Sequence, residues 1–163
     1  MSRLVIVLCL ALLAAGCGFK PRASLAVATS LGPVAVSTVD PYSPLGQDLA
    51  TALERAGASA AVQGQPAATL QVLTENLRTR PLTFESGASV REYQSIYRVE
   101  FQLTGADGAI QVPRQTVELT REYTYDAIGS IGTPAEERLL REELRRDMVA
   151  AILRRLDAAL RTD

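Results

Sequence analysis

The chain contains no histidine, only two cysteines and a single lysine among its 163 residues. Without histidine there is no imidazole to act as a general base, to activate a serine or cysteine nucleophile, or to bind a metal ion. The single lysine, Lys20, stands close to the N-terminus in a segment that we expect to be a tether, where it is badly placed for a serine–lysine pair. These absences exclude most classes of enzyme. We expect a protein without catalytic activity, cofactor or metal.

The N-terminus opens with a short positive segment, Met1-Ser2-Arg3, and continues as an uninterrupted apolar run to Ala15. The run is about a dozen residues long, whereas a helix needs about 20 to cross a bilayer, so it is typical of a secretory signal peptide. Small residues lead directly into Cys17, an arrangement that resembles the bacterial lipobox. The resemblance implies that residues 1–16 are removed and that Cys17 carries an S-diacylglycerol and an N-acyl group. The alternative is an ordinary signal peptide that happens to end at a cysteine.

Acylation of Cys17 would decide where the protein lies. Each buried methylene of a fatty acid contributes about 0.8 kcal/mol, and two or more chains anchor firmly. Gly18 follows, rather than the aspartate that tends to retain such lipoproteins at the inner membrane, which predicts the periplasmic side of the outer membrane. Cys9 would leave with the signal peptide, so no disulfide could form. Loss of Arg3 from 17 basic residues, against 18 acidic ones, leaves a weakly acidic chain and argues against nucleic-acid binding.

The rest of the chain predicts a tether over residues 17–24 and a single domain over residues 25–163. Alternation of apolar and polar residues indicates the strands, and a serine or threonine followed by proline indicates each helix start. The predicted strands are 34–39, 69–80, 90–104 and 115–125, and the predicted helices follow Ser43-Pro44 and Thr133-Pro134. This order, β-α-β-β-β-α, predicts an α+β fold. We expect a two-layer α/β sandwich, with a four-stranded, mostly antiparallel sheet and two helices on one face.

Details within the strands refine this prediction. Rows of threonine, glutamine and glutamate along the long strands indicate that one face of the sheet is packed and the other is wet. The apolar positions of the second strand change phase, which predicts a bulge near Thr74-Glu75. The segment 105–108 ends in Asp-Gly and predicts a hairpin turn. Arg121 interrupts the apolar series of the last strand.

The element order and a set of scattered motifs resemble the family of the lipopolysaccharide-assembly lipoprotein LptE. The residues that carry the resemblance are Cys17-Gly18-Phe19, Glu92-Tyr93-Gln94, Tyr97-Arg98-Val99, Arg121, Tyr123, Tyr125, Glu136-Glu137, Asp147 and Leu153-Arg154-Arg155-Leu156. The resemblance implies a domain that sits largely inside the lumen of a large β-barrel partner, LptD. There it would plug the barrel, help it to assemble and contact lipopolysaccharide during export.

Two other interpretations remain open. The first is a free-standing outer-membrane lipoprotein that binds another periplasmic ligand or envelope component. The second is a periplasmic hydrolase that uses carboxylates such as Glu142-Glu143, or Glu100 with Glu118, although such residues are common on the surface of strands and helices.

Lipopolysaccharide carries phosphates, so its contact surface should offer arginine or lysine. Arg78, Arg80 and Arg91 flank the tip 81–90, which also bears Phe84, and we hypothesise that this end of the sheet is the contact. The alternative is three solvated arginines. Members of the family place a basic residue in this tip and another before the last helix. Here Glu85 and Thr133 hold those places. We expect the arginines of the last helix to be solvated or to face the barrel: Arg138, Arg141, Arg145, Arg146, Arg154 and Arg155.

Overall fold

The computed structural model describes residues 31–82, 90–126 and 134–161. The elements, in chain order, are β1 (Pro33–Ser37), α3 (Pro44–Arg55), β2 (Ser59–Ala60), β3 (Ala68–Pro81), β4 (Val90–Thr104), β5 (Ile110–Asp126) and α4 (Pro134–Leu160). Both predicted helices and all four predicted strands are therefore present. The predicted signal peptide, Cys17 and the tether lie outside the described residues. Within the described parts, no helix is both long enough and apolar enough to cross a bilayer.

The sheet has five strands in the order β2-β1-β3-β4-β5, which corrects the prediction of four. The fifth strand, β2, is two residues long, too short to give an alternating pattern in the sequence. It arises because the chain returns from α3 beside β1 and pairs with it in parallel, at Pro33↔Ser59 and Val34↔Ala60. β1 also pairs in parallel with β3, whereas β3, β4 and β5 are antiparallel. The sheet is therefore mixed.

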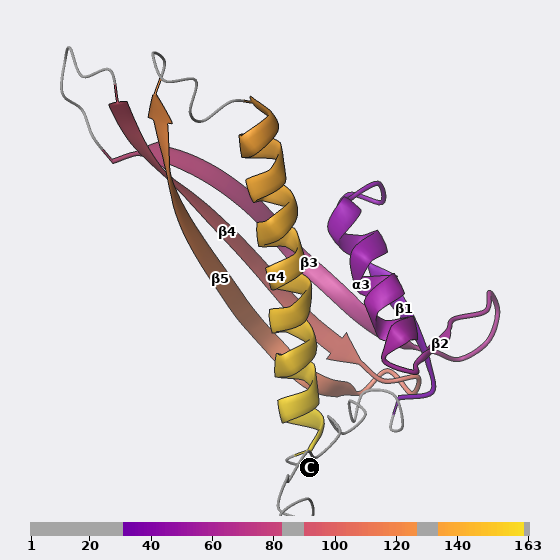
Figure 1. Ribbon diagram of the computed structural model, residues 1–163. Helices are drawn as coiled ribbons and strands as arrows, with labels where there is room; N and C mark the ends of the chain where they lie inside the picture. The colour runs from indigo at the N-terminus through magenta and orange to yellow at the C-terminus, as the bar shows by residue number, and fades with distance from the viewer. Residues whose placement is uncertain (1–30, 83–89, 127–133, 162–163) are drawn as a thin grey trace, which may run out of the picture.

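Both helices cover the same face of this sheet (Figure 1). Ser43 caps α3, since its Oγ accepts a hydrogen bond from the Leu45 amide at 3.2 Å, and Pro44 follows at the first helical position. Helical spacing then places one leucine on each turn of α3 towards the sheet. The side chains that fill the core from the two helices are Leu45, Leu49, Leu53, Leu144, Met148, Ile152 and Leu156. From the sheet, Phe101 and Val99 of β4 meet them and are fully buried.

A bulge in β3 aligns the apolar residues of that strand. The register with β4 shifts between Val72 and Thr74, so Leu73 is the extra residue. This confirms the predicted bulge at a position one or two residues earlier. Because of the shift, Leu70 and Leu77 both lie on the helix-covered face, although they are an odd number of residues apart. The hairpin turn is also confirmed, with Gly108 at a φ of 83° and its amide bonded to the Gly105 carbonyl.

Candidate functional site

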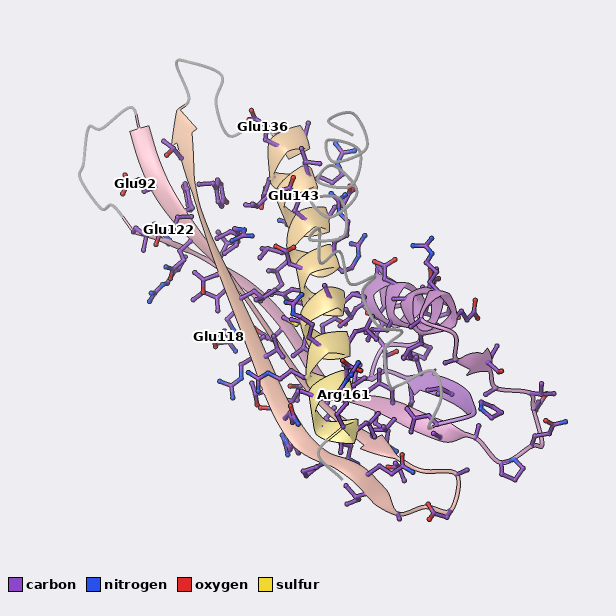
Figure 2. All side chains as sticks on the ribbon, turned by 60° about the horizontal axis from the view of Figure 1, so that its bottom comes forward. Glu92, Glu118, Glu122, Glu136, Glu143 and Arg161 are labelled. Carbon is purple, nitrogen blue, oxygen red and sulfur yellow. The ribbon has the colours of Figure 1, made fainter. Side chains whose placement is uncertain are left out.

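The face of the sheet turned away from the helices, here called the open face, is polar along most of its length, with Ile96 as an apolar exception. Residues of three strands meet on it in register: Asn76, Arg78 and Arg80 of β3, Gln94, Arg98, Glu100 and Gln102 of β4, and Glu118 and Glu122 of β5. Figure 2 places Glu118 and Glu122 along β5, away from α4. These rows are the predicted wet face, since their sequence neighbours Val99, Phe101 and Val117 are buried under the helices.

Cross-strand contacts order the side chains of the open face. Arg98 lies between Glu100, at 3.2 Å, and Glu118, at 3.9 Å, and Arg114 pairs with Glu100 as well. The hydrogen bonds from Arg114 and Arg98 to Glu100 hold the pKa of its carboxyl below the ordinary value. A general acid needs the opposite shift, so Glu100 does not have the environment of that chemistry.

Two of the three predicted contact arginines lie together on the open face. Arg78 pairs in register with Ile96 and lines a hollow of about 480 Å³ that Arg98 and Glu118 also line. The Arg80 Nε donates to Gln94 Oε1 at 2.9 Å, and Gln94 Nε2 donates in turn to Glu122 Oε1 at 3.1 Å. Among the described residues, neither Arg78 nor Arg80 has a carboxylate partner. Their charge is therefore available to an anion.

The other predicted contact residues are less completely placed. Arg91 lies at the same end of the sheet, opposite Tyr125 in the register. In the alternation along β4, position 91 falls on the same face as Tyr93 and Tyr97, which is the helix-covered face, whereas Arg78 and Arg80 lie on the open face. Phe84 lies outside the described residues, as do Glu85 and Thr133.

The sequence analysis missed a polar cluster on the helix-covered face. Glu75 accepts hydrogen bonds from the Ser43 Oγ and from the Tyr97 hydroxyl, both at 2.6 Å. Burial, with the bond to Glu75 second, raises the pKa of Tyr97 well above its ordinary range, so the phenol keeps its proton. The cluster joins the start of α3 to the middle of the sheet. Only the shift of phase in β3 could have signalled that Glu75 turns towards the helices.

Two ion pairs connect α4 to the elements around it. Arg121 of β5 bonds Asp147 at 2.7 Å, which explains the arginine in the apolar series of that strand. Arg145 bonds Asp48 of α3 at 2.6 Å, and this contact corrects the expectation that all arginines of the last helix are solvated or face a partner. Along α4 itself, Glu137 pairs with Arg141 and Asp157 with Arg161, as their spacing predicts. The spacing of Glu142 and Arg146 also suits a pair, but Arg146 Nε donates to the backbone carbonyl of Glu142 at 3.4 Å.

These contacts leave the open face with ordered and mostly paired charges. Within the residues that the structure describes, no group of three or more acidic or cysteine side chains is arranged to hold a metal ion. The acids of the open face are paired or hydrogen-bonded to neighbours, and the phenol of Tyr97 is buried. The arrangement can bind anions at Arg78 and Arg80 and can pack against a polar wall.

The family model and the curated relative that match this sequence agree on one family. Residues 31–156 match the sequence model of the family described as LptE, lipopolysaccharide-assembly. The LPS-assembly lipoprotein LptE of Photorhabdus laumondii is 27% identical over 148 residues, which cover 89% of this chain and 79% of that protein.

Solved structures of lipoproteins are similar in fold. Uncharacterized lipoprotein B of Nitrosomonas europaea has a TM-score of 0.70 and 26% identity, covering 86% of this chain and 91% of the other. The minor lipoprotein of Acinetobacter baumannii has a TM-score of 0.64 and 20% identity, covering 78% and 92%. Rare lipoprotein B of Shewanella oneidensis has a TM-score of 0.62 and 22% identity, covering 78% and 95%. These relatives share the sandwich described above over most of their length.

Proposed function

The chain belongs to the LptE family of lipopolysaccharide assembly, and from this membership we propose that it is the lipoprotein partner of an LptD β-barrel, working without chemistry of its own. The observation that carries the proposal is the match over residues 31–156, which spans every described element from β1 to most of α4. In this role the protein plugs the barrel, helps it to assemble and contacts lipopolysaccharide.

The open face supports the role of a plug. The lumen of a wide barrel is polar and filled with water unless something occupies it. A body that fits there needs a polar exterior whose side chains are held in place, because free long side chains lose conformational entropy when they are packed against a wall. Arg98 and Glu100 of β4 pair with each other and with Glu118 and Arg114 of β5, and Gln102 Nε2 donates to Gln71 Oε1 at 2.6 Å. The face is thus preorganised for polar contacts.

Arg78, Arg80, Arg91 and Phe84 form the proposed contact with lipopolysaccharide. Arg78 and Arg80 have no competing carboxylate among the described residues, and a guanidinium can bind a phosphate through two parallel hydrogen bonds. Leu82, 37% exposed, adds apolar surface at the same end of β3. Cationic and apolar groups side by side suit an amphiphile that carries both phosphates and acyl chains.

The remaining part of the proposal concerns the membrane anchor. Residues 1–16 are a signal peptide, Cys17 is acylated, residues 17–24 are a tether, and residues 25–163 form the domain on the periplasmic side of the outer membrane. This part is supported by the lipobox-like sequence and by the lipoprotein relatives.

Purification of the native protein from detergent-solubilised outer membrane tests the proposal. We expect a large β-barrel protein in a near-stoichiometric ratio, and depletion of the lipoprotein should leave the barrel misassembled and lipopolysaccharide missing from the cell surface. A Cys17→Ala variant, which cannot be acylated, controls for contacts that form only after lysis. Recovery of a lone monomer, with normal surface lipopolysaccharide after depletion, would instead favour a free-standing lipoprotein with another ligand.

A further inference from the structure

Among the described residues, the outer edge of β5 is a long, regular strand edge without a partner. β5 is the last strand of the sheet, and its residues 115–126 pair with β4 without interruption, from Gln115↔Phe101 to Asp126↔Val90. Among the described residues, no backbone hydrogen bond outside the ladder reaches this stretch. Every second residue of an antiparallel edge strand directs its amide and carbonyl away from its neighbour. The edge therefore offers a row of free donors and acceptors.

Proteins usually protect such an edge. Proline, bulges, inward charges or a very short strand prevent another chain from pairing with it. In β5 the proline, Pro113, and the two irregularities of register all lie near the start of the strand, before Gln115. At the opposite edge of the sheet, β2 has two residues, and a strand this short gives another chain little to pair with. Residues 115–126 contain no proline and no bulge, and their one inward charge, Arg121, is paired with Asp147.

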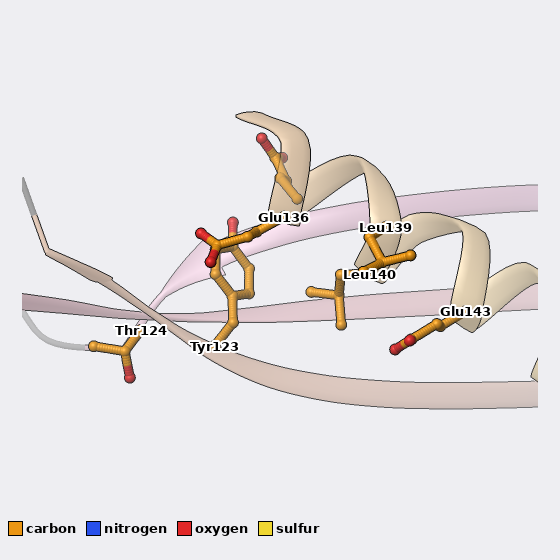
Figure 3. A pocket seen from close by; sticks show the side chains of 7 residues that line it. Tyr123, Thr124, Glu136, Leu139, Leu140 and Glu143 are labelled. Carbon is orange, nitrogen blue, oxygen red and sulfur yellow. The ribbon is translucent and has the colours of Figure 1, made fainter. Parts of the chain in front are cut away.

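An apolar pocket opens at this edge, between the end of β5 and the first turns of α4. It has a volume of about 310 Å³, and Tyr123, Leu139 and Leu140 form its apolar lining (Figure 3). Tyr123 stacks on Tyr93 of β4, with ring centroids 5.5 Å apart, so the wall of the pocket on the side of the sheet is held in place. Leu139 is 52% exposed although it faces this space. A strand added beside β5 would place alternate side chains against these groups.

Both faces of the edge are acidic. Glu143 of α4 lies at the pocket and has no ion pair among the described residues. On the open face, Glu118 is half exposed with a distant partner, Arg98 at 3.9 Å, and the bond that Glu122 makes among the described residues is to the amide of Gln94. The nearest cation on the helix-covered face of β5, Arg121, is already neutralised by Asp147. Basic side chains therefore complement this edge, and acidic ones would be repelled.

We propose that residues 115–126 of β5 accept an added strand from a protein partner, an extended segment in which apolar residues alternate with lysine or arginine. Its main chain pairs with the free edge, its apolar side chains enter the pocket at Tyr123 and Leu139, and its basic side chains meet Glu118 and Glu122 on the open face. Main-chain pairing supplies affinity and the alternating pockets supply specificity, as in other cases of strand addition. Glu118 also lines the hollow of Arg78, but the peptide experiment reads the main chain of β5 and uses no lipopolysaccharide, so the two proposals are tested separately.

Hydrogen exchange on the purified full-length protein in detergent tests the proposal, with a synthetic peptide as the probe. The probe is acetyl-Val-Lys-Tyr-Lys-Val-Lys-amide, whose length of about six residues is that of a common strand. At saturation, we expect amide exchange to slow by about tenfold or more at alternate residues of 115–126, those not already bonded to β4. A peptide of the same composition with its lysines together, and one with glutamate in place of lysine, should bind at least about tenfold more weakly.

Matched variants locate the contact. Leu139→Ser should weaken binding of the peptide by about tenfold, whereas Val62→Ser, at a loop residue of similar exposure (57%), should leave it unchanged. Glu118→Gln should weaken it by about threefold, and Glu54→Gln on α3 should not. The exchange experiment uses the unaltered protein, so it does not depend on the folding of any variant. Binding without slowed exchange in β5, equal affinity for the peptide with its lysines together, or no binding would each overturn the proposal.

Discussion

Replacing Tyr97 with phenylalanine removes one hydroxyl from the contact between the sheet and the start of α3. The ring is 3% exposed, so the substitution changes almost no packing and leaves only the hydrogen bond to Glu75, 2.6 Å long, to be lost. A hydrogen bond to a charged group contributes about 1.5–3 kcal/mol. Because water can reach Glu75 in part and Ser43 still donates to it, we expect the lower end, about 1.5–2 kcal/mol of lost unfolding free energy.

Urea unfolding followed by circular dichroism measures this loss. With a slope of about 1.5–2 kcal/mol per molar for a domain of this size, the midpoint should fall by about 1 M. The same substitution in a Glu75→Ala background should cost nothing or should stabilise, because the Tyr97 hydroxyl is then buried without an acceptor. The difference between the two backgrounds isolates the contact from the effect of the ring.

Alkaline pH gives a second measurement on the same residue. The pKa of Tyr97 is raised in the folded protein, so above pH about 10 the unfolded chain loses a proton that the folded protein keeps. The contribution of this group is therefore fully present below pH about 10 and is lost above it, by up to about 1.4 kcal/mol per pH unit, and Tyr97→Phe should be free of that slope. A neutral effect of Tyr97→Phe at pH 7, together with identical alkaline slopes, would refute the reasoning.

Three further predictions concern other parts of the molecule. Arg78→Glu and Arg80→Glu together should reduce lipopolysaccharide binding by the purified protein at least about tenfold, and unchanged affinity would remove these residues from the contact. Arg114→Gln should move the pKa of Glu100 up towards its ordinary value, which NMR titration measures. The lowered pKa stabilises the folded protein at pH values above the unfolded pKa of Glu100, and this stabilisation is lost as the pH falls. The variant lacks part of this stabilisation, so its stability should be less sensitive to acid. Phe101→Ala should cost about 3–5 kcal/mol in urea unfolding because the ring is fully buried, whereas Leu139→Ala, at an exposed side chain, should cost less than about 0.5 kcal/mol.

Local patterns were sufficient to predict the helices and the long strands. Ser43-Pro44 and the leucines that follow it specify α3 through capping and spacing alone, and the alternation along β4 specifies which of its residues are buried. These signals are short-range, so they can be read from one segment at a time. The LptE-family resemblance that rested on them is confirmed by the family match.

Features that depend on two distant segments could not be predicted in this way. β2 exists only because β1 lies beside it, and neither of its residues has a distinctive pattern. Glu75 forms its cluster with residues 32 and 22 positions away, and the partner of Arg145 is 97 positions away. Such contacts require the register and the helix packing, which the sequence of one segment does not contain.

The extra residue in β3 decides which side of this strand is charged. Side chains alternate with a period of two, so if Leu73 took an ordinary place in the ladder, the two faces would be exchanged for everything that follows in the strand. Arg78 and Arg80 would then turn into the apolar layer beneath the helices, and Leu77 would turn out into water. Deletion of Leu73, by contrast, would leave a regular ladder and keep every later side chain on its present face.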